Sequence, residues 1–146
     1  MKKILFLITC LLITGCGEKF TICNIKNEKF EQEWKYTTKK EKITNIDLNI
    51  VYNNSMFGIE NLEKLNTNEK IVLKREILSK LGFEKDHYDG LDIDIIITNQ
   101  INIKIKADLE TANKDLLNKV GFDIDNFDRN INSAKKSLIE SGAVCK

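Results

Sequence analysis

Cys16 is the residue with the clearest chemistry, because its thiol directly follows a short apolar run near the start of the 146-residue chain. Two lysines open the chain, residues 4–13 are almost entirely apolar, and two small residues stand before the cysteine. These are the three sections of a secretory signal peptide. The last four residues, Ile13-Thr14-Gly15-Cys16, are typical of a bacterial lipobox. In a lipobox the cysteine sulfur receives a diacylglycerol, and cleavage leaves that cysteine as the first residue.

The apolar run is too short for a membrane-spanning helix, which needs about 20 residues. We therefore expect residues 1–15 to be a cleaved signal peptide and residues 16–19 to be the lipidated cysteine with a short tether. Residues 20–146 are expected to form a single domain. The anchor would hold it on the extracytoplasmic face of the cell membrane, or on the outer membrane if the cell has two. An uncleaved anchor and a chance pattern are the alternatives.

The four cysteines separate by position. Cys10 would leave with the signal peptide and Cys16 would carry the lipid, so Cys23 and Cys145 remain near the two ends of the domain. Outside the cytoplasm, an even pair favours a disulfide bond. Closing a loop of about 120 residues would stabilise the fold by about 4–5 kcal/mol through loop-closure entropy. Two free thiols are the alternative, whereas a redox pair would need a Cys-x-x-Cys spacing.

A metal site is one possible use of His87, the single histidine of the chain, which has Asp86 and Asp89 beside it. Imidazole and carboxylate groups suit zinc or manganese. A polar stretch before a strand is more typical of an exposed loop. We therefore predict no metal site and no cofactor, and we keep a solute- or metal-binding lipoprotein as an alternative.

Two further motifs resemble functional sites without their full patterns. Ser133 and Lys136 match the Ser-x-x-Lys motif of serine acyl-enzymes, but the elements that accompany that motif are missing. Residues 123–128 resemble a calcium loop but lack the glycine at the sixth position and the distal glutamate. Aspartate and asparagine at this place favour a helix cap. We predict no catalytic residues, and a small envelope hydrolase is the least favoured alternative.

Aromatic residues at strand spacing give the remaining candidate site. They can line an apolar ligand pocket or a contact surface, or they can form the core beneath helices, which is the commoner arrangement. The two interpretations differ in whether the helices cover this face of the sheet. The residues are Phe20, Phe30, Trp34 and Tyr36.

The charge balance excludes one class of partner. The full chain has 23 basic and 22 acidic side chains, and loss of two lysines with the signal peptide leaves 21 against 22, a formal net charge of −1. Nucleic-acid binding requires a basic face that neutralises phosphates, so we expect no nucleic-acid partner. The expected partners are the membrane, through the lipid on Cys16, and an envelope protein of unknown identity.

Alternating apolar residues predict three strands in the first part of the chain, over 20–26, 30–38 and 43–52. Ile43 is out of phase with the residues after it, so we expect a β-bulge near Thr44 or Asn45. Asn66 followed by Glu69 predicts a capped helix over 67–81 that ends at Gly82. Its expected buried stripe consists of Val72, Leu73, Ile77, Leu78 and Leu81.

Residues 91–109 predict an isoleucine-rich hairpin. Both apolar sets fall on one face only if a three-residue turn pairs Ile97 with Ile101. The same register places two carboxylates opposite lysines, where we expect ion pairs worth a few tenths of a kcal/mol each. These pairs are Asp92 with Lys106 and Asp94 with Lys104.

The last part of the chain predicts a short helix over 113–120, closed by Gly121, and a longer helix over 126–141. The expected buried stripe near the longer helix consists of Ile124, Phe127, Ile131, Ala134 and Leu138. The tail over 143–145 would reach back to Cys23. We therefore predict an α+β fold in which two main helices pack on an antiparallel sheet, built from a meander and the isoleucine-rich hairpin.

This order of features resembles the YehR-like lipoproteins, a family of small bacterial envelope proteins. The shared features are the lipobox at Cys16, the early Cys23 in a strand, the mid-chain helix, the hairpin, the segment 116–123 and a terminal helix running into 141–146. The resemblance covers nearly the whole chain after Cys16 and implies an α+β fold. It implies no activity and assigns no functional residues. We therefore expect a binding or interaction module held at the outer face of a membrane.

Overall fold

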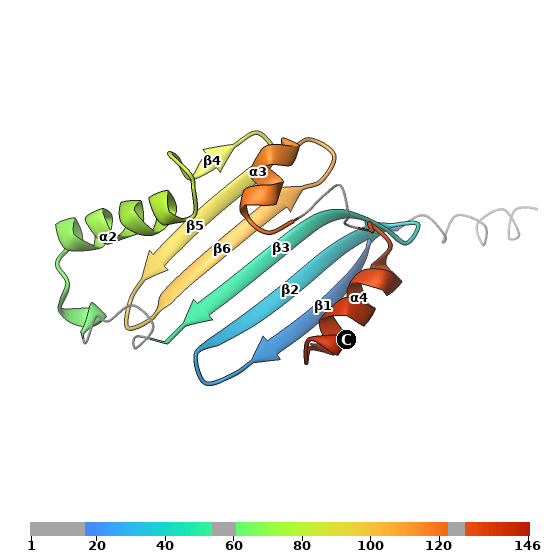
Figure 1. The fold of residues 1–146 in the computed structure, drawn as a ribbon, viewed down its shortest axis with the longest axis horizontal. Coiled ribbons are helices and arrows are strands. Elements are labelled where there is room, and N and C mark those ends of the chain that lie inside the picture. The colour runs from blue at the N-terminus through green and yellow to red at the C-terminus, as the bar shows by residue number, and fades with distance from the viewer. Residues whose placement is uncertain (1–16, 54–60, 123–127) are drawn as a thin grey trace, which may run out of the picture.

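The computed structural model describes residues 17–53, 61–122 and 128–146. Across these ranges the chain forms one antiparallel sheet of seven strands with helices packed on it, as predicted. In Figure 1, α3 and α4 lie in front of the sheet and α2 lies along its β5 edge. The predicted signal peptide and Cys16 lie outside the described residues. None of the described helices is long and apolar enough to cross a membrane.

The first three strands form the predicted meander. They are β1 (Lys19–Lys26), β2 (Phe30–Lys39) and β3 (Lys42–Tyr52). Thr37 pairs with Asn45 whereas Thr38 pairs with Ile43, so Thr44 is the extra residue of a bulge on β3. The predicted bulge is therefore confirmed, and it explains the change of phase along this strand.

The predicted hairpin is formed by β5 (Leu91–Ile97) and β6 (Ile101–Asp108), and Ile97 pairs with Ile101 as expected. Strand β6 also pairs with β3, which joins the hairpin to the meander. Two very short strands, β4 (His87–Tyr88) and β7 (Val144–Cys145), flank the outer strands. The resulting order is β4-β5-β6-β3-β2-β1-β7.

The sheet has two different faces. On the face that we call the helix face, apolar side chains from neighbouring strands form the core; they include Tyr36, Ile46, Leu48, Ile93 and Ile105. On the opposite face, which we call the open face, positive and negative side chains alternate across the strands in paired positions: Lys35, Asp47, Lys106 and Asp92. A strand directs successive side chains to opposite faces, so this pattern follows directly from the alternation in the sequence.

A short 3-10 helix, η2 (Leu62–Lys64), precedes α2 (Thr67–Lys80). The predicted capping box is confirmed, because Glu69 N donates to Asn66 Oδ1 at 3.1 Å and Asn66 N donates to Glu69 Oε2 at 2.8 Å. Ile77 and Leu78 are buried as expected. The predicted stripe is wrong at Val72, which is 54% exposed. Helix α2 meets the sheet mainly along β5, beside the short edge strand β4, and buries a narrow strip.

The later helices are α3 (Lys114–Lys119) and α4 (Ile131–Glu140). Helix α4 begins later than predicted, because the Asn130 side chain accepts a hydrogen bond from Asn132 N at 2.8 Å and caps the helix there. Ile131 and Ala134 are buried as expected. Leu138 is half-buried and packs against the core. The remaining stripe positions, Ile124 and Phe127, lie outside the described residues.

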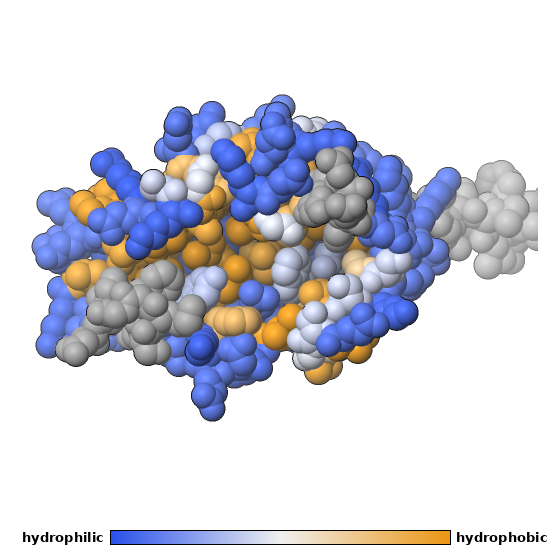
Figure 2. Space-filling model, viewed as in Figure 1, coloured by the Kyte–Doolittle hydropathy of each residue, from blue (hydrophilic) through white to orange (hydrophobic). Residues whose placement is uncertain are grey.

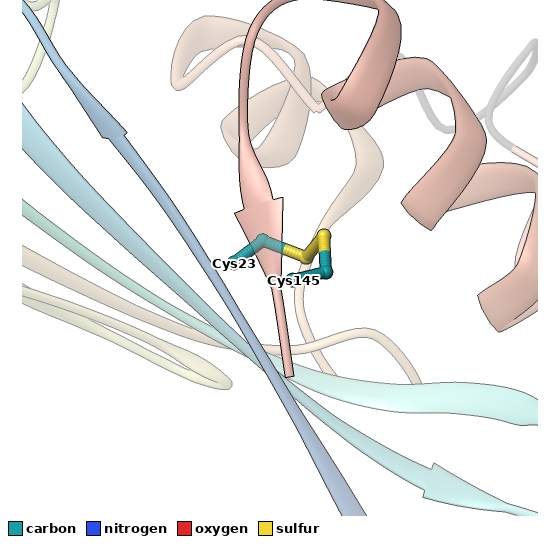
Figure 3. The surroundings of a disulfide bond; sticks show 2 residues. All are labelled: Cys23 and Cys145. Atoms are coloured by element: carbon teal, nitrogen blue, oxygen red, sulfur yellow. A yellow bond between two sulfur atoms is a disulfide. The ribbon is translucent and has the colours of Figure 1, made fainter.

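A disulfide joins Cys23 of β1 to Cys145 of β7, as predicted, with the two Cα atoms 4.0 Å apart (Figure 3). Cys23 is fully buried. Backbone hydrogen bonds continue the pairing, because Ile22 N donates to Lys146 O at 3.1 Å and Lys146 N donates to Ile22 O at 2.8 Å. The bond therefore fixes the tail as the outermost strand of the sheet.

Candidate functional site

A hollow of about 330 Å³ lies on the helix face, between β2, the end of α3 and α4. Trp34, Tyr36 and Phe122 form its aromatic wall, and α4 contributes Ser133, Ala134, Ser137 and Leu138. We call this site the aromatic hollow. In Figure 2 apolar residues are visible on this face between the helices. Among the described residues it is the place where an aromatic wall and polar side chains meet.

The aromatic wall is held by ring contacts. Trp34 stacks on Tyr36 with ring centroids 6.2 Å apart, and Phe122 meets Trp34 edge-on at 5.8 Å. Trp34 and Tyr36 are two residues apart on β2, so they share a face. Gly121, with φ +85°, ends α3, and Phe122 N donates to Leu117 O at 2.9 Å. This helix-ending turn brings Phe122 back onto Trp34.

The two β2 aromatics have different exposures. Tyr36 is only 2% exposed, and burial raises its pKa to about 12, so its hydroxyl stays protonated at physiological pH. Trp34 is half-buried, and its Nε1 donates to Gln32 Oε1 at 3.4 Å. Tyr36 is therefore part of the core, whereas Trp34 joins the core to the hollow. The core interpretation is confirmed for Tyr36, and Trp34 packs against the core while it lines the hollow.

The polar side of the hollow is formed by Asp128 and Ser133. Hydrogen bonds from the Ser133 side chain and from the Asn130 backbone lower the pKa of Asp128 below its ordinary value. The bond from Asn130 N measures 2.9 Å. Asn130, not Asp128, caps α4, whereas Asp128 accepts a hydrogen bond in the turn before the helix. Residues 123–127 of the predicted capping segment lie outside the described residues. An ionised carboxylate therefore stands beside an apolar wall. Such a site suits a group with an apolar body and a hydrogen-bond donor or cationic end.

The other two predicted aromatics lie elsewhere. Phe20 is on the open face and 58% exposed, and Lys35 Nζ lies 4.6 Å from its ring centroid. Phe30 contacts Tyr52 with ring centroids 6.4 Å apart. Phe122 was not among the predicted site residues. Its signal in the sequence was its place directly after Gly121, where a chain leaving a helix turns back.

His87 lies in β4 and not in a loop, and its ring Nδ1 contacts Asp92 Oδ1 of β5. The predicted ion pairs with Lys104 and Lys106 are wrong, because the hairpin carboxylates have partners outside the hairpin. Asp94 Oδ1 lies 3.6 Å from Lys74 Nζ of α2, and Asp92 contacts His87.

Lys74 also lies 3.7 Å from Asp86, so the carboxylate beside His87 has a cationic partner. In the ranges that the structure describes, no three or more His, Cys, Asp or Glu residues lie close enough together to hold a metal ion. Asp89 follows the pair His87–Tyr88 and is exposed. Contacts with Lys74 and His87 therefore account for the carboxylates of Asp86, Asp92 and Asp94.

No protein-family model matches the sequence. A comparison with curated proteins also finds no match. The fold is similar to the NMR structure of the E. coli YehR protein, with a TM-score of 0.51 and 15% sequence identity. The likeness covers 75% of this chain and 73% of the YehR chain. At this identity it shows the fold alone, so the chain has a YehR-like fold.

Proposed function

We propose that this chain is a bacterial lipoprotein of the YehR-like family, anchored in the membrane through a diacylglycerol on Cys16. Its domain is a non-enzymatic binding module on the extracytoplasmic face of the cell envelope. The signal peptide and lipobox pattern over residues 1–16 supports the anchor. The Cys23–Cys145 disulfide supports an oxidising compartment, because such bonds persist outside the cytoplasm. The YehR-like fold supports the family.

The aromatic hollow is the observation that carries the binding function. Its volume of about 330 Å³ lies within the range of small-molecule sites, about 300–1,000 Å³. Trp34 and Phe122 offer apolar contact, and Asp128 offers a fixed negative charge at one side. The occupant that fits this chemistry is an aromatic or aliphatic side chain of an envelope protein, next to a donor or cationic group.

A small solute with the same chemistry is the second candidate, and the size of the hollow favours it. If the ligand were instead a metal ion, its site would centre on His87, which contacts Asp92. Calorimetric titration of the protein with divalent ions tests for this metal binding directly.

In-cell cross-linking with mass spectrometry tests the proposal, comparing the native protein with three variants. Ser137→Phe places an aromatic ring in the hollow, since Ser137 is exposed and lines it. Ser79→Phe makes the same change on the exposed side of α2 and is the matched control. Cys16→Ala removes the proposed anchor. We expect a partner captured by the native and Ser79→Phe proteins, and capture reduced about tenfold by Ser137→Phe, which corresponds to about 1.4 kcal/mol of binding.

The Cys16→Ala form should lose the partner altogether, because it would no longer stay at the membrane. Equal capture by Ser137→Phe and the native protein would show that the hollow is not the binding site. If no form captures a protein, native mass spectrometry decides the solute alternative. A small molecule carried by native protein but not by Ser137→Phe would replace the protein partner with a solute.

A further inference from the structure

Three exposed apolar residues gather on the open face where β1 meets β7. Phe20 is 58% exposed, Ile22 36% and Val144 66%. Phe20 and Ile22 are two residues apart on β1, so they point to the same side. Val144 pairs with Asn24, and Asn24 is two residues after Ile22, so Val144 lies diagonally beside Ile22. We call these three residues the edge patch.

The edge patch is close to the proposed anchor along the chain. Only Gly17, Glu18 and Lys19 separate Cys16 from Phe20. Four extended steps span at most about 14 Å, so Phe20 cannot lie farther than this from the lipidated residue. The headgroup layer on each side of a bilayer is about 5–8 Å thick. A chain that is anchored at Cys16 therefore keeps Phe20 within about 14 Å of the lipidated residue, close enough to reach the headgroup layer.

Two lysines flank the edge patch on the open face. Lys35 Nζ stands 4.6 Å from the Phe20 ring centroid. Lys146 is joined to Ile22 by two backbone hydrogen bonds. Lysine side chains extend past apolar groups and place the ammonium in the headgroup layer, where anionic lipids attract it. Aromatic and aliphatic side chains with lysines around them are the pattern of a surface that lies in the membrane interface.

From these observations we infer that the edge patch inserts into the membrane interface, with Lys35 and Lys146 among anionic headgroups. This inference rests on the proposed anchor and adds the orientation of the domain. A second copy of the chain is a poorer occupant, because a stable interface buries about 800 Å² on each partner and the edge patch has only three side chains. With the open face toward the bilayer, the aromatic hollow on the opposite face points away from it, toward soluble partners.

Tryptophan quenching in vesicles tests the orientation on the full acylated chain. Ile22→Trp places a fluorophore in the edge patch. Ile96→Trp is a closely matched control, since Ile96 is 37% exposed on the same open face but lies on β5, toward the other side of the sheet. Both variants retain Trp34, so its emission is a common background. The vesicles contain equal parts of phosphatidylethanolamine and phosphatidylglycerol, with or without bromine on the acyl chains.

We expect bromine to remove about half of the emission that Ile22→Trp adds, and to leave that of Ile96→Trp nearly unchanged, because an interfacial side chain reaches the acyl boundary. If acylated protein floats with the vesicles but Ile22→Trp is not quenched, the inference is wrong while the anchor stands. Cross-links between copies at the edge patch, without quenching, would assign the patch to a second copy and overturn the inference. Protein that carries no diacylglycerol and does not float would overturn the anchor itself, and mass spectrometry of the same sample shows this separately.

Discussion

Replacing Cys23 and Cys145 together with alanine should lower the free energy of unfolding by about 4–5 kcal/mol, because the bond closes a very long loop in the unfolded chain. The two cysteines are 122 residues apart in sequence. Domains of this size are stable by only about 5–15 kcal/mol, so the loss is a large share of the total. Strand β7 has two residues, and the bond holds it against β1. Urea unfolding followed by Trp34 fluorescence measures the change.

The control is the native protein under reducing conditions, which loses the cross-link without losing the side chains. Its free energy of unfolding should fall by a similar amount, and that of the double variant should not change when reductant is added. A loss below about 1 kcal/mol in both would show that closing this loop constrains the unfolded chain far less than loop-closure entropy predicts.

Gly90→Ala should lower the free energy of unfolding by about 2–5 kcal/mol, because two penalties add at this position. Gly90 has a φ of +71°, which disfavours residues with a Cβ. A Cβ there would also lie 2.8 Å from Ala112 Cα and still closer to Ala112 N and Thr111 Oγ1. The turn between β4 and β5 would have to move away from the segment after β6. Urea unfolding measures this loss as well.

Gly142→Ala is the matched control. Gly142 has a φ of +94°, but no atom among the described residues lies within 4 Å of a Cβ placed there. It should therefore cost only the conformational part, about 1–2 kcal/mol. Equal losses at the two glycines would show that the close approach of Ala112 contributes nothing.

The strands could be predicted from sequence because their apolar side chains alternate. The hairpin register could be predicted because only some pairings bring the apolar sets of both strands to one face. Ile97 and Ile101 had to pair to bring both apolar sets to one face, and they do. The bulge at Thr44 could be predicted because Ile43 is out of phase with the alternation of the residues after it. The placement of β6 beside β3 could not be predicted in this way, because pairing between distant strands leaves no local pattern.

The predictions from sequence were wrong where an element outside the local pattern determines what a side chain contacts. The hairpin register correctly set Asp94 opposite Lys104, but α2 supplies Lys74, which is the partner that Asp94 contacts. Val72 fits a helical stripe, but α2 meets the sheet mainly along β5 and leaves this residue exposed. A local pattern predicts which face of a helix or strand is apolar, whereas the neighbouring elements determine how much of that face is buried.

The candidate site was predictable only in part. Trp34 and Tyr36 share a face by spacing alone, and the structure places them together. Phe20 was grouped with them, but it lies three residues from Cys23 on β1, and an odd separation puts the two on opposite faces. Phe122 joins the site through the turn that ends α3, a contact that strand spacing cannot reveal.

The mass of the N-terminal peptide, from protein purified out of cell membranes, shows whether Cys16 is cleaved free and lipidated. Anchoring, localisation and the orientation of the domain all depend on it. We expect a peptide that begins at Cys16 and carries a diacylglycerol, and we expect Cys16→Ala protein to be neither lipidated nor cleaved before residue 16. A peptide that begins at Met1 with an unmodified Cys16 would show that the chain is not a lipoprotein.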